Sequence, residues 1–250
     1  TMPLNSAGGQ PSLLGYYYLN GASYLLASDG YGDTYYFNGS SWVSIFTSGY
    51  SYKFSATAMV QFDGKAWLLA DKSTGGTING GYWVPGGTNG TFTAVSALPK
   101  GNTIVSFKNR LWVSAGQGAS VDSTVIYYSN GFGGSGAFWP STPNLFYVGA
   151  GDGQDIVKLV VYYNSILIFK QNSIYQFQFD TDPTLGYQSI MAPSVGLDHR
   201  NSLALWENYI YFTYDDRAFE LVNSRASQIN VKVPFVADSR ANIDASQARA

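Results

Sequence analysis

Apolar and polar residues alternate in short runs over residues 156–179, IVKLVVYYNSILIFKQNSIYQFQF. The apolar runs are rich in Val, Ile, Tyr and Phe, and polar residues interrupt them at Asn164-Ser165 and at 171–173. Alternation with β-branched and aromatic residues is typical of strands, and short polar breaks are typical of hairpin turns. The segment therefore predicts a three-stranded antiparallel meander.

The rest of the chain contains imperfect copies of this hairpin. In each copy an aromatic residue or Leu precedes a polar turn pair, and the next strand carries an aromatic residue or Ile. The residues before the turns are Leu19, Phe62, Phe107, Tyr163 and Trp206, the turn pairs are Asn20-Gly21, Asp63-Gly64, Lys108-Asn109, Asn164-Ser165 and Glu207-Asn208, and the residues in the strands after them are Tyr24, Trp67, Trp112, Ile168 and Tyr211. The copies are 43, 45, 56 and 43 residues apart. A period of this size with about four short strands suits a β-propeller blade.

We therefore predict an all-β fold, a β-propeller-like array of about five antiparallel blades that is either incomplete or part of a larger propeller. A large sandwich or a stack of meanders is the alternative, but neither requires a repeat period. We expect little helix, because no apolar pattern with a 3.6-residue period is present.

The pattern divides the chain into a lead-in at 1–12, a propeller-like domain at 13–236 and a polar tail at 237–250. The repeats cover 13–50, 54–98, 103–150, 154–195 and 200–235. The tail, ADSRANIDASQARA, is expected to be a short helix, a linker or the entry to a further segment. Neither end supplies a clear closing strand, so we expect a segment of a larger protein or closure against other chains. Tyr16–Tyr18 and Val231–Val236 would then be buried contacts.

Composition narrows the function classes. Only 12% of the residues are charged and the net charge is −2, with Lys and Arg scattered singly, which argues against tight nucleic-acid binding. The 28 Gly and 20 Tyr fit strands joined by tight turns. The chain has no Cys, and no apolar run reaches the roughly 18–20 residues of a membrane helix.

Candidate chemistry is sparse. His199 is the only His and lies in Asp198-His199-Arg200, between the fourth and fifth repeats. A role in a surface turn or in packing is more ordinary for it than that of a catalytic base. Two short acidic segments are weak candidates for binding a metal ion. One contains Asp152 and Asp155, and the other contains Asp180 and Asp182. Neither pair matches the 12-residue calcium loop, so Asx turns are the more ordinary explanation. No metal site and no cofactor is predicted.

Aromatic residues outside the expected core are the remaining candidates. Tyr16, Tyr17 and Tyr18 are consecutive, so their side chains must point to both faces of a sheet. Phe138 and Trp139 lie in the Gly-rich loop 130–141. Such residues can stack on sugars or anchor a protein interface, although packing between blades is the more ordinary role.

The stretches at 103–116, 125–130, 149–177 and 194–212 resemble the propeller-type structural tail proteins of tailed bacteriophages, of the nozzle, hub or tail-stabilisation kind. The shared features are the hairpins, the Tyr-Tyr-Ser strand, the Gly-Asp-Gly loop, the Phe-Lys-x-x-Ser-Ile-Tyr strand and the turn at 196–202. The match covers about half of the chain, 103–223, and its motifs are structural. The Gly-rich loop at 130–136 departs from the pattern.

The resemblance implies a non-enzymatic virion component of the tail or neck, present as a ring of several copies that contacts other tail proteins and takes part in DNA ejection. A weakly charged wall would touch translocating DNA only passively. The alternative from another class is a glycan-binding propeller that recognises a host surface through Tyr and Trp. An enzyme fits the residues least, and no membrane association is expected.

Overall fold

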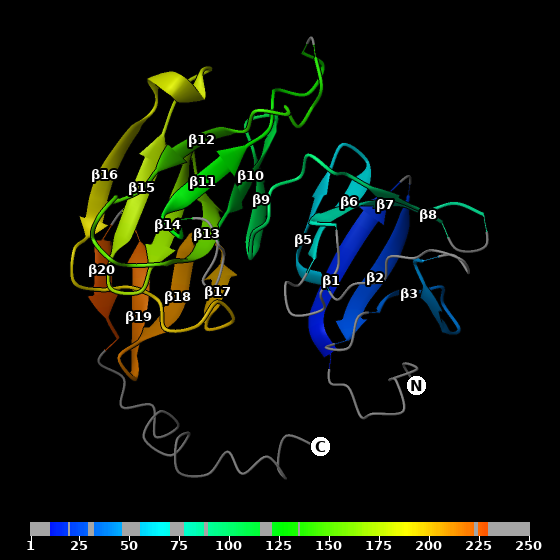
Figure 1. Cartoon of the computed structure of the whole chain (residues 1–250). Helices are drawn as coiled ribbons and strands as arrows, with labels where there is room; N and C mark the ends of the chain where they lie inside the picture. The colour runs from blue at the N-terminus through cyan, green and yellow to red at the C-terminus, as the bar shows by residue number, and fades with distance from the viewer. Residues whose placement is uncertain are drawn as a thin grey trace.

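The computed structural model describes residues 11–19, 21–29, 33–46, 56–70, 78–87, 90–115, 122–134, 136–222 and 225–229. These residues form β-strands joined by turns (Figure 1). Over the same ranges the helical structure is a 3₁₀ turn, η2 (Pro183–Leu185), and no α-helix occurs. The predicted all-β class is therefore confirmed.

The strands form five four-stranded antiparallel sheets, which we term blades 1 to 5 in chain order. Blade 1 contains β1 (Pro11–Leu19), β2 (Ala22–Asp29), β3 (Thr34–Phe37) and β4 (Trp42–Ser44), and blade 2 contains β5 (Ala56–Phe62), β6 (Lys65–Ala70), β7 (Gly80–Val84) and β8 (Thr91–Ala94). Blade 3 contains β9 (Thr103–Phe107), β10 (Arg110–Ser114), β11 (Val125–Tyr128) and β12 (Asn144–Tyr147). Blade 4 contains β13 (Ile156–Tyr162), β14 (Ser165–Lys170), β15 (Ile174–Gln178) and β16 (Tyr187–Ala192), and blade 5 contains β17 (Leu203–Trp206), β18 (Tyr209–Tyr214), β19 (Arg217–Val222) and β20 (Arg225–Gln228).

Each blade is a simple meander, because its strands are paired in the order in which they follow along the chain. The first strands of successive blades lie side by side, β1 beside β5, β5 beside β9 and β9 beside β13. Sheets that meet along their first strands while their other strands spread outward form a propeller-like array (Figure 1).

The hairpin turns between the first and second strands lie at the predicted, equivalent places in four of the five blades. Asp63-Gly64 and Lys108-Asn109 take positive φ at both residues, with values of 50° and 63° and of 45° and 60°. Such turns match the right-handed twist of paired strands, and Gly or Asn tolerates the left-handed backbone. The recurring turn fixes the same register in each blade.

The turn of blade 4 differs from the prediction by one residue. Tyr162 pairs with Ser165, so the turn is Tyr163-Asn164 and not Asn164-Ser165. Ser165 is buried and its hydroxyl donates to the carbonyl of Tyr162 at 2.8 Å, while Tyr163 takes a φ of 49°. A shift of one residue exchanges the faces of a strand. The residue equivalent to Trp67 and Trp112 is therefore Leu167, and the predicted equivalence of Ile168 was wrong.

The residues that the structure describes include only part of the two ends of the predicted domain. The lead-in was placed at 1–12, whereas β1 begins at Pro11, which pairs with Asp29. The predicted tail at 237–250 and the predicted contact segment Val231–Val236 lie outside the described residues.

The buried apolar residues form four clusters, each between two successive blades. Tyr17 and Trp83 belong to the cluster of blades 1 and 2, and Trp67 and Leu111 to that of blades 2 and 3. Trp112 joins blades 3 and 4, and the remaining cluster, which contains Phe169, joins blades 4 and 5. Among the described residues no such cluster joins blade 5 to blade 1.

Substitution of Trp112 tests whether these clusters stabilise the fold. Its side chain is fully buried, stacks on Tyr128 with ring centroids 5.0 Å apart, lies 5.7 Å from the ring of Phe177 in blade 4, and donates its Nε1–H to the carbonyl of Phe107. We predict that Trp112→Ala lowers the free energy of unfolding by about 3–5 kcal/mol, measured by urea denaturation. Leu185→Ala, at a residue that is 82% exposed, is the control and should change it by less than about 0.5 kcal/mol. Equal effects would contradict the assignment of the core.

Candidate binding surfaces at the two ends of the blade array

Each blade has two faces with different neighbours. We term the face toward the following blade the forward face and the face toward the preceding blade the backward face. In blade 2, Trp67 packs in the cluster with blade 3, and the next residue, Leu68, packs in the cluster with blade 1. The backward face of blade 1 and the forward face of blade 5 have no neighbouring blade among the described residues. These are the two end faces of the array.

The blade 1 end face carries exposed apolar and aromatic side chains. Leu14, Tyr16 and Tyr18 lie on one side of β1 and are 64%, 69% and 53% exposed. Phe37 and Trp42, a cross-strand pair of β3 and β4, lie on the same face with ring centroids 5.4 Å apart. Other residues of this face, Ala27 and Tyr35, are buried.

The three consecutive tyrosines therefore have different environments. Tyr17 points to the opposite side of β1 and is 1% exposed, with its ring centroid 6.2 Å from that of Trp83. Its prediction as a contact residue is corrected, because strand alternation places it in the core between blades 1 and 2. Burial raises the pKa of Tyr17, and Asp63 raises it further. Tyr16 and Tyr18 remain candidates.

A depression of about 280 Å³ lies on blade 5, and another of about 500 Å³ lies on blade 1. The larger one is lined by Tyr16, Ser23, Tyr24, Phe37 and Asn38 together with Ala22, Leu25, Tyr36 and Gly39. The hydroxyl groups of Tyr16 and Ser23 are hydrogen-bonded at 2.5 Å. Aromatic surfaces beside a few polar groups are the usual lining of a ligand site.

The blade 5 end face was not identified from the sequence. Trp206 pairs with Tyr209, and Ala204 pairs with Tyr211, so these four side chains lie on one face. Trp206 is 67% exposed and Tyr209 is 37% exposed. The rings of Tyr209 and Tyr211 are stacked, with centroids 6.0 Å apart. Alternation along 204–211 was the available signal, but it did not show that this face lacks a following blade.

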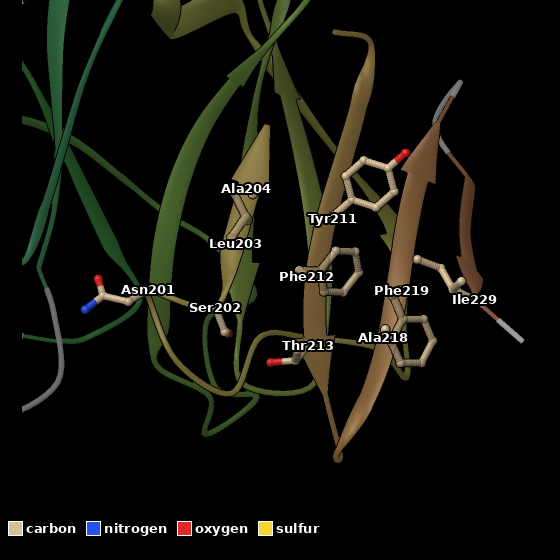
Figure 2. A pocket seen from close by; sticks show the side chains of 10 residues that line it. All are labelled: Asn201, Ser202, Leu203, Ala204, Tyr211, Phe212, Thr213, Ala218, Phe219 and Ile229. Atoms are coloured by element: carbon tan, nitrogen blue, oxygen red, sulfur yellow. The ribbon is translucent and has the colours of Figure 1, made fainter. Parts of the chain in front are cut away.

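Figure 2 shows the depression of blade 5. Its wall includes the small side chains of Ser202, Ala204, Thr213 and Ala218, together with the ring of Tyr211. Ile229 closes the wall on the β20 side, and its N–H donates to the carbonyl of Ala218 at 2.9 Å. Small residues beside a large ring leave a hollow that an apolar side chain of a partner could fill.

The aromatic residues of the Gly-rich loop are packing residues. Trp139 is 5% exposed and belongs to the cluster of blades 2 and 3, so its prediction as a contact residue is corrected. Phe138 is half-buried and stacks on Phe62, with ring centroids 5.5 Å apart and planes 15° apart. The loop between β11 and β12 thus packs on the β5–β6 hairpin of blade 2, which accounts for two large rings in a Gly-rich segment.

The carboxylate of Asp152 forms an ion pair with Lys170 of the same chain. Both of its carboxylate oxygens accept from Lys170 Nζ at 2.7 Å, and the Lys170 side chain is fully buried while that of Asp152 is 22% exposed. Lys170 also donates to the carbonyl of Val148 at 2.8 Å. The ion pair ties the connection between blades 3 and 4 to the end of β14. Sequence reasoning missed Lys170, whose only signal was a charge at the end of an apolar run.

The other candidate carboxylates have local roles. Asp182 caps η2, accepting from the N–H and the hydroxyl of Thr184, and these bonds lower the pKa of Asp182. Asp180 offers its backbone carbonyl to Lys108 Nζ at 3.1 Å, and the N–H of Asp155 donates to Gln171 Oε1 at 3.4 Å. Within the described ranges, no three residues of the types His, Cys, Asp or Glu are grouped as a metal site would need.

His199 lies in the exposed turn between blades 4 and 5. Its backbone carbonyl accepts from the N–H of Ser202 at 2.9 Å and from the hydroxyl of Ser202 at 2.7 Å. These bonds form a turn and use no imidazole atom.

None of the helical structure in the described ranges is long and apolar enough to cross a membrane.

Comparisons with known proteins bear on the fold alone. No protein-family model matches the chain, and no curated protein matches it either. Among solved structures it is similar to BamB from Moraxella catarrhalis, with 9% identity and a TM-score of 0.52 over 86% of this chain and 60% of that one. It is also similar to the computationally designed Ika8 protein, with 9% identity and a TM-score of 0.53 over 88% of this chain and 60% of that one.

These similarities define the class of protein as β-propeller-like. The chain spans about 60% of the length of these two structures. Since 216 chains of solved structures match, the fold is widely shared and does not single out a function.

The pair of Asp152 and Lys170 gives a prediction about stability. We expect Asp152→Ala to lower the free energy of unfolding by about 3–5 kcal/mol, because it leaves a buried ammonium without its carboxylate. Lys170→Met should cost less, about 1–2 kcal/mol, because the remaining carboxylate is partly exposed to water. Thermal and urea unfolding would measure both, with Asp155→Ala as the control. If the double variant were no more stable than Asp152→Ala alone, the assigned role of the pair would be wrong.

Proposed function

We propose that this chain is a non-enzymatic structural component of a bacteriophage tail or neck that assembles with other proteins of the virion. The observation that carries the proposal is the pair of end faces. Each presents large apolar or aromatic side chains to solvent, namely Leu14, Tyr16 and Tyr18 on blade 1 and Trp206 and Tyr209 on blade 5. Apolar patches of this kind are typical of interfaces with other proteins.

The charge of the chain supports the same proposal. With a net charge of −2 and 12% charged residues, its surface has little to attract the phosphates of DNA. A tail component near the path of the genome must let DNA pass without holding it, so contact with translocating DNA would be passive. The resemblance of residues 103–223 to propeller-type tail proteins is a further reason to propose a place in the virion.

Chemistry at the candidate sites favours a structural role over an enzymatic one. The carboxylate of Asp152 is engaged by Lys170, that of Asp182 caps a turn, and the bonds of His199 use its backbone. A hydrolytic site would need a nucleophile, a base and a group that orients the base, held within hydrogen-bond reach of one another. The described groups serve packing and turns instead.

Location in the particle tests the proposal. We predict that antibodies to this chain label the tail or neck of purified phage particles in immunoelectron microscopy, and that mass spectrometry finds several copies in each particle. Particles assembled without the chain are the control and should lose the label. Abundant chain in infected cells together with its absence from particles would contradict the proposed function.

Glycan binding at blade 1 is the second candidate, and the depression of about 500 Å³ is the observation that favours it. Tyr16 and Phe37 offer ring surfaces on which a sugar could stack. Ser23 and Asn38 supply polar groups beside them. In this case the same array would recognise a host surface.

A glycan array distinguishes the two candidates. If blade 1 binds sugars, we predict that Tyr16→Ala reduces binding about tenfold or more, because one stacking surface is lost. Tyr163→Ala is the matched control, since this residue is 64% exposed but lies in a turn of blade 4. No binding to any glycan by the wild-type chain would rule out the second candidate and leave the first in place.

A further inference from the structure

The register of the strands shows which positions of a blade pack against the preceding blade and which pack against the following one. The same positions can be compared at the two end faces. The third residue of the second strand lies on the forward face in every blade for which a following blade is present. In blades 2, 3 and 4 these residues are Trp67, Trp112 and Leu167, and each packs in the cluster with the next blade. Tyr211 is the third residue of β18, so it occupies the position of a side chain that packs beneath a following blade.

The fourth residue of the same strand defines the backward face. Leu68, Val113, Ile168 and Phe212 each pack in the cluster with the preceding blade. Leu25, the fourth residue of β2, occupies this position in blade 1, on the face that carries Tyr16 and Phe37. The blade 1 end face is therefore built as a surface that receives the forward face of another blade.

The two end faces also agree in chemistry. The exposed and half-buried residues of the blade 1 end face, Leu14, Tyr16, Tyr18, Leu25, Phe37 and Trp42, carry no charge. The one carboxylate that strand alternation adds to this side of β2, that of Asp29, is buried. The blade 5 end face carries Ala204, Trp206, Tyr209, Tyr211 and Ala218, together with Glu220, which accepts from the hydroxyl of Ser227 at 3.4 Å. Each face has a depression that can take a side chain.

We propose that the blade 5 end face of one copy of this chain binds the blade 1 end face of a second copy. A second copy always supplies the complementary face, because each copy carries both halves of one blade-to-blade contact. The contact would extend the series of four interfaces already present within the chain, with the same strand positions meeting. This inference depends on the register of the blades and not on the proposed place in a virion.

The proposed contact joins two different faces, so it is head-to-tail. Head-to-tail contacts close into a ring or continue as an open series, whereas a two-fold dimer pairs one face with itself. A variant of either face alone should therefore weaken assembly. Two variants with damage on opposite faces should still bind each other once, because each retains the face that the other needs.

Sedimentation velocity of the full chain tests this arrangement. We expect the wild type to associate in a concentration-dependent manner. Tyr211→Glu and Tyr16→Glu should each raise the apparent dissociation constant about a hundredfold or more, because a carboxylate would be buried against an apolar face. An equimolar mixture of the two variants should recover a complex that stops at one copy of each. Leu185→Glu, at an exposed residue of η2, is the control and should associate as the wild type does.

Three results would overturn the inference. The first is a wild type that stays monomeric at high concentration. The second is association that persists in either variant. The third is a mixture that fails to associate although both variants fold. Circular dichroism and thermal unfolding establish that each variant is folded, and Trp206→Glu and Tyr18→Glu provide a second variant of each face.

Discussion

Packing of one blade against the next is the interaction on which the rest of the structure depends. A four-stranded meander buries neither of its faces by itself, and here both faces carry large side chains, as Trp67 and Leu68 do in blade 2. Stability therefore resides in the contacts between neighbours, as in other repeat proteins. The turns and the register matter because they decide which side chain meets which neighbour.

The sequence predicted the blades because the features that define them are local. A polar turn pair, an aromatic residue before it and an alternating strand after it all lie within about a dozen residues, and the hairpin turns were placed correctly in four blades. Blade 4 differed because Tyr163 adopts a left-handed backbone at a position where Asn or Gly is usual. Residue type alone favoured Asn164-Ser165, whereas burial of Ser165 decided the register.

The candidate sites were less predictable because their roles depend on distant partners. Alternation showed that Tyr16 and Tyr17 face opposite ways, but only the position of blade 2 determines that Tyr17 is the buried one. Asp152 looked like a metal ligand because Lys170, the cation that it binds, is 18 residues away, at the end of β14. Trp139 looked exposed in a Gly-rich loop, although the loop folds over blade 2.

Among the described residues, the two end faces of the array lack the blade-to-blade contact that the other faces make. Each internal blade gains two partners, whereas blades 1 and 5 have one each among the described residues, so Trp206 and Tyr16 face solvent although their positions are those of packed residues. A fold whose stability is a sum of neighbour contacts gains from any partner that supplies one more. Exposed aromatic rings at positions that are packed in the other blades are the observation on which the proposed interfaces rest. The exposed side chains of the two end faces are mostly uncharged. This composition suits contacts in which shape and register decide the partner.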